Sequence, residues 1–325
     1  FDLLDEGPTR LKLRLEGWRE RLLDTHEDGP PSRPKLDPVR PDREPEDHRR
    51  AVARGIEYIR AGDIFQVNLA QRFHAGYRGD PLWLHERLME QAPAPFAAFI
   101  GLSEPETRAR PDWHDRALVS ASPEWFYTVT GDRIVTRPIK GTRPRRPDPD
   151  EDRAEAEALL NSPKDRAELT MIVDLERNDI GKVCLPGSVR VREPLTLESH
   201  AQVHHLVATV DGRLKPDADP VTVLEAMFPG GSITGAPKIR AMQIIDELEP
   251  VRRGPYTGAI GWIGRGGSTR FNIAIRTAVV ERDQATFKVG GGLVADSDPQ
   301  AEYEETLHKA RGLIDALTPV PPESN

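Results

Sequence analysis

A single lysine stands between a proline and a glycine in the stretch TRPIKGTRPR, which covers residues 136–145. Proline fixes its own backbone angle, and glycine permits a sharp bend or a close backbone approach. Arg137, Arg143 and Arg145 crowd the same segment, and neighbouring cations lower the pKa of a lysine. Only a neutral amine can attack carbon. The stretch therefore indicates Lys140 as a poised nucleophile, with a solvated basic loop as the alternative.

A glutamate lies on the apolar face of a helix that the sequence S-P-K-D, residues 162–165, should begin. Serine caps helices, proline suits the first helical position, and an acidic residue three positions later completes a capping box. The helix is expected to run to about Asn178. Glu168 shares a face with three apolar residues: Met171, Ile172 and Leu175. A carboxylate there needs a cationic partner or a metal ion. The sequence allows two alternatives for Glu168: a salt bridge to an arginine, or a metal site.

The last helix carries two more carboxylates on one side. Asp298 can cap it, and Pro299 occupies its first position. Glu302, Glu305 and Lys309 then follow at i, i+3 and i+7, beside an apolar stripe. Carboxylates one turn apart can present oxygens to magnesium, which prefers oxygen ligands, although exposed Glu/Lys faces have the same spacing.

Two glycine-rich stretches and one arginine could complete a site for a small polyanion. The loop FPGGSITGAPKIR, residues 228–240, lacks the Lys and Ser/Thr of a nucleotide-binding loop, which excludes ATP binding there. It leads into a helix at Pro237, whose first amides could face an anion. Gly290 to Gly292 allow close backbone approach or a tight turn. Arg276, in the alternating segment FNIAIRTAVV, is expected in a strand and needs an anionic partner if it faces inward.

These residues need elements to position them, and the hydrophobic pattern predicts several. Helices are expected over residues 10–23 and around 52–62, and strands over residues 64–73, 96–101, 117–121, 124–130 and 133–137. The proline-rich residues 24–46 are typical of a linker or surface loop rather than a packed element. Strands in runs together with long helices favour a layered α+β architecture.

Composition narrows the classes of partner. The chain has 325 residues and a net charge of −8, which argues against a nucleic-acid partner. No apolar run is long enough to cross a bilayer, so neither a membrane partner nor a location outside the cytoplasm is expected. The single cysteine, Cys184, excludes an internal disulfide and a cysteine-based zinc cluster.

The chain resembles the chorismate-utilising enzymes, and within them the aminodeoxychorismate synthase component I branch. The resemblance rests on long stretches between about residues 48 and 315, including GDIFQVNLAQRF, SPEWF, RPIKGTRPR, KDRAELTMIVDLERNDIGKV, VHHLV, FPGGSITGAPKIRAMQIIDELEP and GGGLVADSDPQAEYEETLHKARG. It implies a four-layer α/β/β/α sandwich with mixed, mainly antiparallel sheets. It also implies chorismate as substrate and Mg²⁺ as cofactor.

Two positions discriminate among members of this family. Relatives that add water to the ring carry a lysine base where Gln66 stands, and water, unlike ammonia, needs a base. Anthranilate synthases carry an alanine where Lys140 stands, whereas aminodeoxychorismate synthases carry this lysine. The resemblance therefore implies amination of chorismate to 4-amino-4-deoxychorismate, on the route to para-aminobenzoate and folate, through a covalent lysine intermediate. Anthranilate synthase component I and a non-catalytic chorismate-binding subunit are the alternatives.

The resemblance also implies a role for each site residue. Lys140 is the nucleophile and Glu124 protonates the leaving hydroxyl. Glu168 and Glu305 hold the metal ion, and Glu302 acts on it through water. The residues implied in substrate binding are Gln66, Gly141, Thr142, His205, Thr234, Gly235, Trp262, Arg276, Gly290, Gly291, Gly292 and Lys309. Trp262 replaces a tyrosine that is usual in the family, and an indole can only donate a hydrogen bond.

A partner and a domain division follow from the same resemblance. The resemblance implies a glutamine amidotransferase subunit (component II) as the source of ammonia. Cys184 has no nucleophile-elbow context, so it is no candidate for a glutaminase nucleophile. Residues 1–46 are expected to be the remainder of an N-terminal region with a proline-rich linker, residues 47–318 the catalytic domain, and residues 319–325 a tail.

Overall fold

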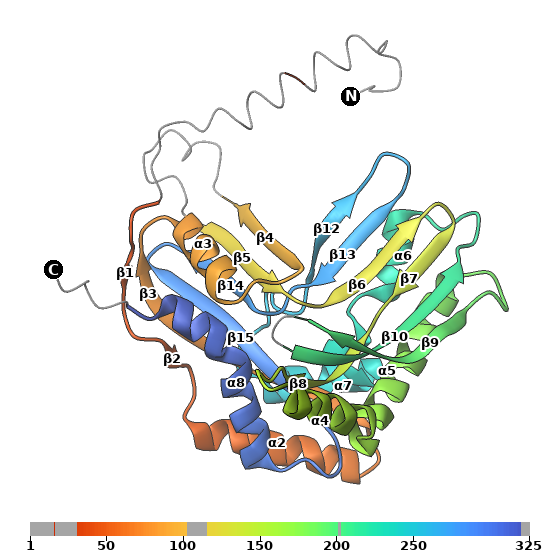
Figure 1. Ribbon diagram of the computed structural model, residues 1–325, viewed down its shortest axis with the longest axis horizontal. Coiled ribbons are helices and arrows are strands. Elements are labelled where there is room, and N and C mark those ends of the chain that lie inside the picture. Colours follow the sequence, from red (N-terminus) through yellow and green to blue (C-terminus); the bar gives the residue numbers. More distant parts are fainter. Residues whose placement is uncertain (1–15, 17–30, 103–115, 201–202, 320–325) are drawn as a thin grey trace.

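The computed structural model describes residue 16 and residues 31–102, 116–200 and 203–319. The helix expected over residues 10–23 lies outside these residues, apart from Glu16. Two β-sheets and the helices that cover them make up the described chain, which confirms the α+β class (Figure 1). No helix in the described residues is both long and apolar enough to cross a membrane.

The first sheet has the strand order β1-β3-β15-β14-β5-β4, with β2 and β11 also paired to β3. Its strands are β1 (Lys35–Leu36), β2 (Arg40–Pro41), β3 (Gln66–Arg78), β4 (Phe96–Gly101), β5 (Arg116–Ser122), β11 (Gly235–Ala236), β14 (Thr277–Glu281) and β15 (Gln284–Leu293). The structure contains the strand expected from residue 64, which is β3 and continues to Arg78. It also contains the four strands expected between residues 96 and 137, two in this sheet and two in the second sheet.

The second sheet has the order β12-β13-β6-β7-β10-β8, with β9 paired to β10. Its strands are β6 (Trp125–Thr130), β7 (Arg133–Thr136), β8 (Ile139–Pro144), β9 (Arg190–Ser199), β10 (Val203–Arg213), β12 (Ala259–Ile263) and β13 (Thr269–Ile273). Every pairing between named strands of the described chain is antiparallel, so the expectation of mixed sheets was wrong. Some pairings join strands that follow one another in sequence, others join distant strands such as β3 and β15, and none of them is the parallel pairing that a βαβ connection gives.

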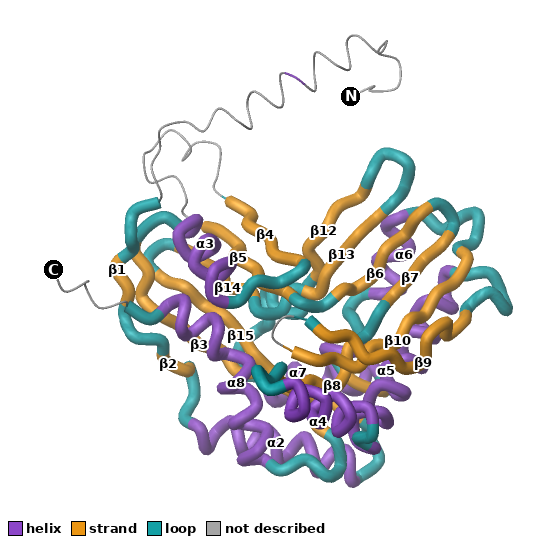
Figure 2. The backbone as a smooth tube through the Cα atoms, viewed as in Figure 1, coloured by secondary structure: helices purple, strands orange, loops and turns teal. Residues whose placement is uncertain are grey.

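Helices cover one face of each sheet (Figure 2). Those on the first sheet are α2 (Pro45–Arg60), α3 (Pro81–Gln91), α7 (Lys238–Leu248) and α8 (Pro299–Leu317). Those on the second are α4 (Pro149–Leu160), α5 (Pro163–Val183) and α6 (Pro220–Met227). Ser162 and Asp298 cap α5 and α8 as predicted, and α5 continues five residues beyond its expected end.

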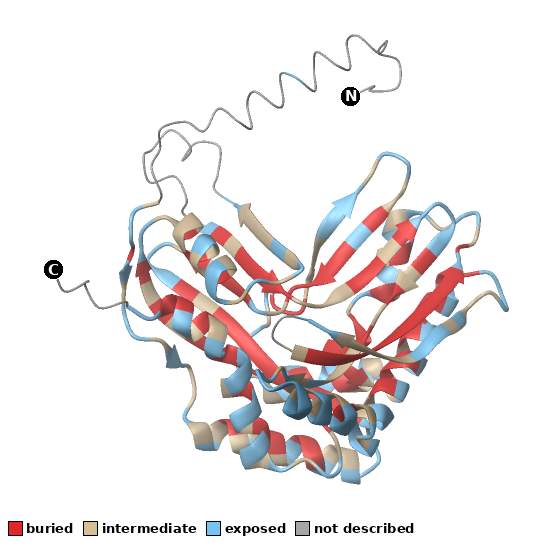
Figure 3. Ribbon diagram, viewed as in Figure 1, coloured by how far each residue is buried: buried red, intermediate tan, exposed pale blue. Residues whose placement is uncertain are grey.

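The apolar cores lie between each sheet and its own helices. One cluster joins α4, α5 and α6 to the second sheet, a second joins α3 and α8 to the first sheet, and a third lies between α2, α7 and the start of β3. Figure 3 shows buried residues along strands of both sheets and on the helices that cover them. Because none of these clusters contains strands of both sheets, polar and charged side chains can occupy the region where the sheets meet.

Two of the places where the chain passes between the sheets are adjacent crossovers. One lies between β5 and β6 and contains Glu124, and the other lies between β13 and β14 and contains Arg276 (Figure 1). Backbone hydrogen bonds join them, from Ile273 to the Glu124 carbonyl (3.1 Å) and from Ala121 to the Arg276 carbonyl (3.0 Å). Arg276 has a φ of +47°, so its predicted place inside a strand was wrong. The chain must bend here to enter the other sheet, and a regular strand cannot do so.

Part of the proline-rich stretch is packed, contrary to expectation. Strand β1 pairs with residues 77–78 of β3, and β2 pairs with residues 73–74. Prolines are tolerated in short edge strands, where one side of the backbone needs no ladder partner. The division into domains at residue 46 stays a prediction.

Candidate active site

A β-bulge positions the lysine singled out by the sequence. Lys140 pairs with Leu206 and Thr142 pairs with His205, so Gly141 is an extra residue in β8. Gly141 has a φ of +76°, and a Cβ there would lie 2.8 Å from the Leu159 side chain. Only glycine fits this position without strain. Because a bulge redirects the side chains beside it, Gly141 determines where Lys140 points.

The neighbouring arginines are neutralised, so the segment is not a solvated basic loop. Each is paired with a carboxylate: Arg137 with Glu198, Arg143 with Asp165, and Arg145 with Asp152. These pairs lie on an ordered strand, β8, and on the residues just before and after it. The sequence-based explanation of a lowered lysine pKa by these three arginines is therefore replaced by another cause.

Burial lowers the pKa of Lys140, and the charge of Lys309 adds to this effect. Glu168, Glu124 and Glu305 oppose it by favouring the ammonium form. The net direction is downward, which increases the fraction of the neutral amine at a given pH. The same influences show that strand β8, helices α5 and α8, and the first crossover bring their charged side chains into one region.

The glycines of β15 form a wall against which these side chains lie. A Cβ on Gly292 would come within 2.7 Å of Gln66 Nε2 and 3.5 Å of Lys140 Nζ, and one on Gly291 within 3.0 Å of Glu302 Oε2. The glycines are extended and paired with β3, so the turn considered from the sequence is not formed. Strand β14 pairs only with residues 284–287 of β15. Among the described strands, the later residues of β15 therefore pair with β3 alone, so their other edge has no strand beside it.

Gln66 is fully enclosed beside the lysine. It is 1% exposed, and neither atom of its side-chain amide has a hydrogen-bond partner among the described residues. Burying a polar amide without partners is costly, so such a group in a native fold calls for an explanation. A bound substrate or reagent that contacts Gln66 would supply it.

Glu124 is held in place at the first crossover by main-chain and side-chain contacts. Its amide donates to Ser122 Oγ (3.2 Å), and Ser232 Oγ donates to Glu124 Oε1 (2.6 Å). Burial raises the pKa of Glu124, although this hydrogen bond and the charges of Lys140, Lys309 and Arg276 lower it. A carboxyl group with a raised pKa can retain a proton near neutral pH and act as a general acid.

The carboxylates predicted to hold a metal ion come from α5 and α8. Glu302 is 6% exposed and accepts a hydrogen bond from Ser297 Oγ (2.6 Å) through Oε1, while its Oε2 has no partner in the part of the chain that the structure describes. Glu305 pairs with Lys309 (2.6 Å), and Lys309 also donates to the Gly290 carbonyl (3.1 Å). The ion pair of Glu168 is with Lys164 on its own helix (4.0 Å), not with an arginine.

This donor set fits magnesium. Among the described residues, no group of three or more His, Cys, Asp or Glu side chains is arranged as a complete ligand set. Magnesium does not need one, because proteins usually hold it through one or two carboxylates, substrate oxygens and water. The unpartnered Glu302 oxygen is the buried group that a hard cation would satisfy.

The remaining residues predicted to bind substrate differ in their contacts and exposure. Thr142 Oγ1 and His205 Nδ1 are hydrogen bonded at 2.9 Å, and burial lowers the pKa of His205 to about 4. Thr234 uses its hydroxyl within its own loop, on the Gly230 carbonyl (2.8 Å). Gly235 packs so tightly that a Cβ would lie 2.1 Å from the Gln66 carbonyl. Trp262 stands apart: it is 54% exposed on the edge strand β12.

Sequence reasoning did not identify Ser232 or Glu176. Ser232 lies inside the FPGGSITGAPKIR loop, where the pattern drew attention to glycines and the helix start, and only its contact with Glu124 reveals it. Glu176 lies two turns beyond Glu168 on α5, at a spacing that could have indicated it.

Glu176 should make the stability of the protein depend on pH. It is 3% exposed, and burial together with the charge of Asp179 raises its pKa from 4.5 to about 8. The folded state then holds a proton that the unfolded state has released, so stability falls as pH rises from about 4.5 to 8. The wild-type free energy of unfolding should therefore fall by roughly 3.5 kcal/mol between pH 5 and 8, and Glu176→Gln, which cannot ionise, should not show this loss.

Urea unfolding at several pH values measures this difference. The exposed Glu225→Gln on α6 is the control and should follow the wild-type pH dependence. Parallel pH curves for Glu176→Gln and wild type would show that Glu176 is ionised in the folded protein.

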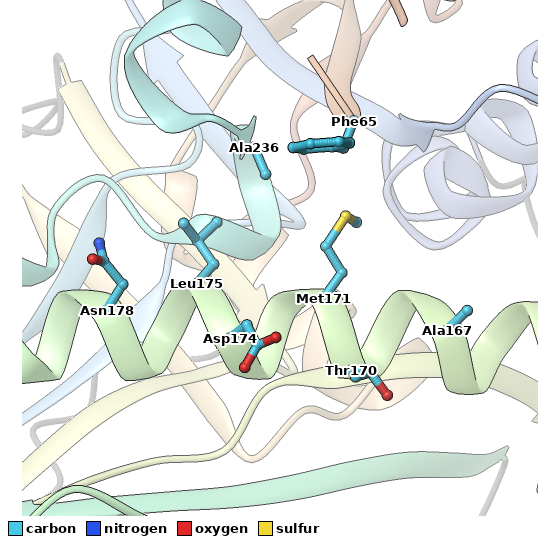
Figure 4. A pocket seen from close by; sticks show the side chains of 8 residues that line it. All are labelled: Phe65, Ala167, Thr170, Met171, Asp174, Leu175, Asn178 and Ala236. Atoms are coloured by element: carbon cyan, nitrogen blue, oxygen red, sulfur yellow. The ribbon is translucent and has the colours of Figure 1, made fainter. Parts of the chain in front are cut away.

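A separate open groove lies between α5 and the segments that carry Phe65 and Ala236 (Figure 4). It measures about 580 Å³ and is lined by Phe65, Ala167, Thr170, Met171, Asp174, Leu175, Asn178 and Ala236. Met171 and Leu175 therefore face this groove, and only Ile172 of the predicted apolar face is fully buried. Glu168 is still mostly covered, with 16% of its side chain exposed.

Comparisons with known proteins agree with this architecture. Residues 5–315 match the chorismate binding enzyme family. The chain is 49% identical over 260 residues to aminodeoxychorismate synthase component 1 of Salmonella typhimurium, which covers 80% of the chain and 55% of that protein. It is 45% identical over 272 residues to anthranilate synthase component 1 of Thermus thermophilus, which covers 84% of the chain and 56% of that protein. The chain thus spans about half the length of these relatives.

A solved structure gives the same result for the fold. Anthranilate synthase component I from Streptococcus pneumoniae superposes with a TM-score of 0.80 and 34% identity, covering 96% of this chain and 67% of that one. The family resemblance and the α+β fold expected from it are confirmed, with sheets that are antiparallel rather than mixed. The two kinds of curated relative have similar identities, so similarity alone does not select one activity.

Proposed function

We propose that this chain, which belongs to the chorismate binding enzyme family, aminates chorismate at ring carbon 4 to give 4-amino-4-deoxychorismate. The observation that carries the proposal is the position of Lys140. Its amine lies beside Gln66 and the β15 glycines, in the region shared by Glu124 and the carboxylates of α5 and α8.

The substrate carboxylates would be bound by the cations and amides of this region. Arg276 at the second crossover, Lys309 on α8 and the amides of residues 290–292 are the groups that match them. Gly141, the Thr142–His205 pair and the loop containing Thr234 and Gly235 would line the same pocket. This binding places the ring against Lys140 and orients carbon 2 toward the amine.

The covalent step would begin with attack of the neutral Lys140 amine on ring carbon 2. The two ring double bonds shift, the carbon–oxygen bond at carbon 4 breaks, and Glu124 gives its proton to the departing hydroxyl, which leaves as water. Ammonia then attacks carbon 4, the double bonds shift back, and Lys140 leaves carbon 2. The product retains the ring diene and has an amino group in place of the hydroxyl.

Glu168, Glu302 and Glu305 would hold magnesium, which supplies a Lewis acid and a template for a substrate carboxylate when it is bound. Gln66 favours ammonia over water as the second nucleophile, because it cannot act as a base. The source of ammonia would be a glutamine amidotransferase subunit. Cys184 is unsuited to release it, since burial raises the pKa of its thiol to about 11 and the residue is 2% exposed.

Anthranilate synthase is the second candidate, because a relative with that name is 45% identical to the chain. Lys140 favours amination at carbon 4, since the resemblance gives anthranilate synthases an alanine there. Incubation with chorismate, a magnesium salt and an ammonium salt, followed by chromatography, separates the candidates. We expect 4-amino-4-deoxychorismate. Fluorescent anthranilate would identify the other activity, and chorismate binding without turnover would identify a non-catalytic subunit.

A further inference from the structure

The loop between α6 and α7 is anchored firmly enough to hold a side chain in one place. Lys238 Nζ donates to the Pro229 carbonyl (2.7 Å) and pairs with Asp179 (2.5 Å), which is 1% exposed. At the other end of the 3₁₀ turn η2 (Gly231–Ile233), Arg253 donates to the Ile233 carbonyl (2.8 Å). Ser232 lies between these anchors and is 6% exposed.

Ser232 meets Glu124 from this rigid loop. Its hydroxyl donates to Glu124 Oε1 at 2.6 Å, which is short and typical of an O–H bond to a carboxylate. The backbone of Glu124 is held independently, by Ser122 Oγ and by the amide of Ile273. With the backbone and one carboxylate oxygen both held, the remaining freedom of the Glu124 side chain is small.

We propose that Ser232 is the positioning residue of the acid: it occupies Glu124 Oε1, so that Oε2 carries the proton delivered to the leaving hydroxyl. This inference rests on the proposed function, in which Glu124 protonates that hydroxyl. A carboxylic acid has one proton, and the oxygen that already accepts a hydrogen bond from a fixed donor is the poorer place for it. Ser232 therefore selects both the orientation of the acid and the oxygen that reacts.

Removing the Ser232 hydroxyl should change the pKa of Glu124. Charged groups act on Glu124 from several elements: Lys140 from β8, Lys309 from α8, Arg276 from the second crossover and Glu176 from α5. The Ser232 hydrogen bond lowers the pKa of Glu124, against the effect of burial. Without it, Glu124 should keep its proton to higher pH, while its side chain loses its fixed orientation.

The test is a double-mutant cycle of Ser232→Ala and Glu124→Gln, measured as chorismate consumption. Ser232→Ala should lower kcat about 10- to 100-fold with little change in KM, because the acid is present but misplaced. The alkaline limb of the kcat profile should move to higher pH. In the Glu124→Gln background, Ser232→Ala should have less than about a twofold further effect, since the group it positions is gone. Ser232→Thr should recover part of the loss, and Ser32→Ala, at an exposed serine, should match wild type.

An equal loss in both backgrounds would overturn the proposal, because Ser232 would then act independently of Glu124. Infrared titration of the carboxyl band that disappears in Glu124→Gln gives a readout that needs no turnover. Its midpoint should be higher in Ser232→Ala than in wild type, and an unchanged midpoint contradicts the proposal. If wild type yields anthranilate or no product, the proposed function fails, whereas this titration still decides the role of Ser232.

Discussion

Replacing Lys140 with alanine should lower the rate of 4-amino-4-deoxychorismate formation by at least about 10³-fold, because the substitution removes the attacking amine. Alanine leaves Gly141 and the bulge of β8 unchanged, so the strand should still form. A loss of this size corresponds to about 4 kcal/mol of transition-state stabilisation, more than a single charge contact to substrate supplies. Product formation is followed by chromatography at saturating ammonium and magnesium.

Lys140→Arg is the matched control for charge. Arginine keeps a cation near Glu168 and Glu305 but cannot act as a nucleophile, since it remains protonated. Chorismate affinity should therefore suffer less in Lys140→Arg than in Lys140→Ala, while turnover is lost in both. Intact-mass measurement during wild-type turnover should find a chorismate-derived adduct that maps to Lys140. Undiminished product formation by Lys140→Ala would refute covalent catalysis at this residue.

Changing Glu302 to glutamine should weaken magnesium binding by about 10- to 100-fold or more, and chorismate turnover should fall with it at low magnesium. Glu302 has a buried oxygen without a partner in the described chain, so its charge is the one that a cation would neutralise most directly. Glutamine preserves the size of the side chain and removes the charge. Isothermal titration calorimetry with magnesium alone measures the affinity without any assay of activity.

Glu304→Gln is the control for this second experiment. Glu304 lies two positions further on α8, is exposed, and accepts a hydrogen bond from Gln300 (2.7 Å). Its substitution should leave magnesium affinity and turnover unchanged. If Glu302→Gln binds magnesium as well as wild type does, the ion is not held at this position. Raising the magnesium concentration should restore part of the turnover if the ion is held there.

The sequence by itself determined several of the helices and strands and the residue types of the site. Helix starts at Ser162 and Asp298 were predictable because capping is local, depending on residues within four positions of one another. The strands were predictable because alternating burial follows from the period of a strand. Lys140 could be singled out because of the proline and the glycine close to it, and the bulge at Gly141 does need a glycine at that position.

Only the tertiary structure decided which of these residues share one environment. The arginines nearest Lys140 in sequence are each bound to a carboxylate, and burial with Lys309, from a helix at the other end of the chain, lowers the lysine pKa instead. Arg276 changed from a strand residue to a crossover residue because the chain must leave one sheet there and enter the other. Ser232 acquired a place beside Glu124 through a contact across 108 positions. Burial and long-range charge depend on packing between distant segments, and no local pattern of residues records that packing.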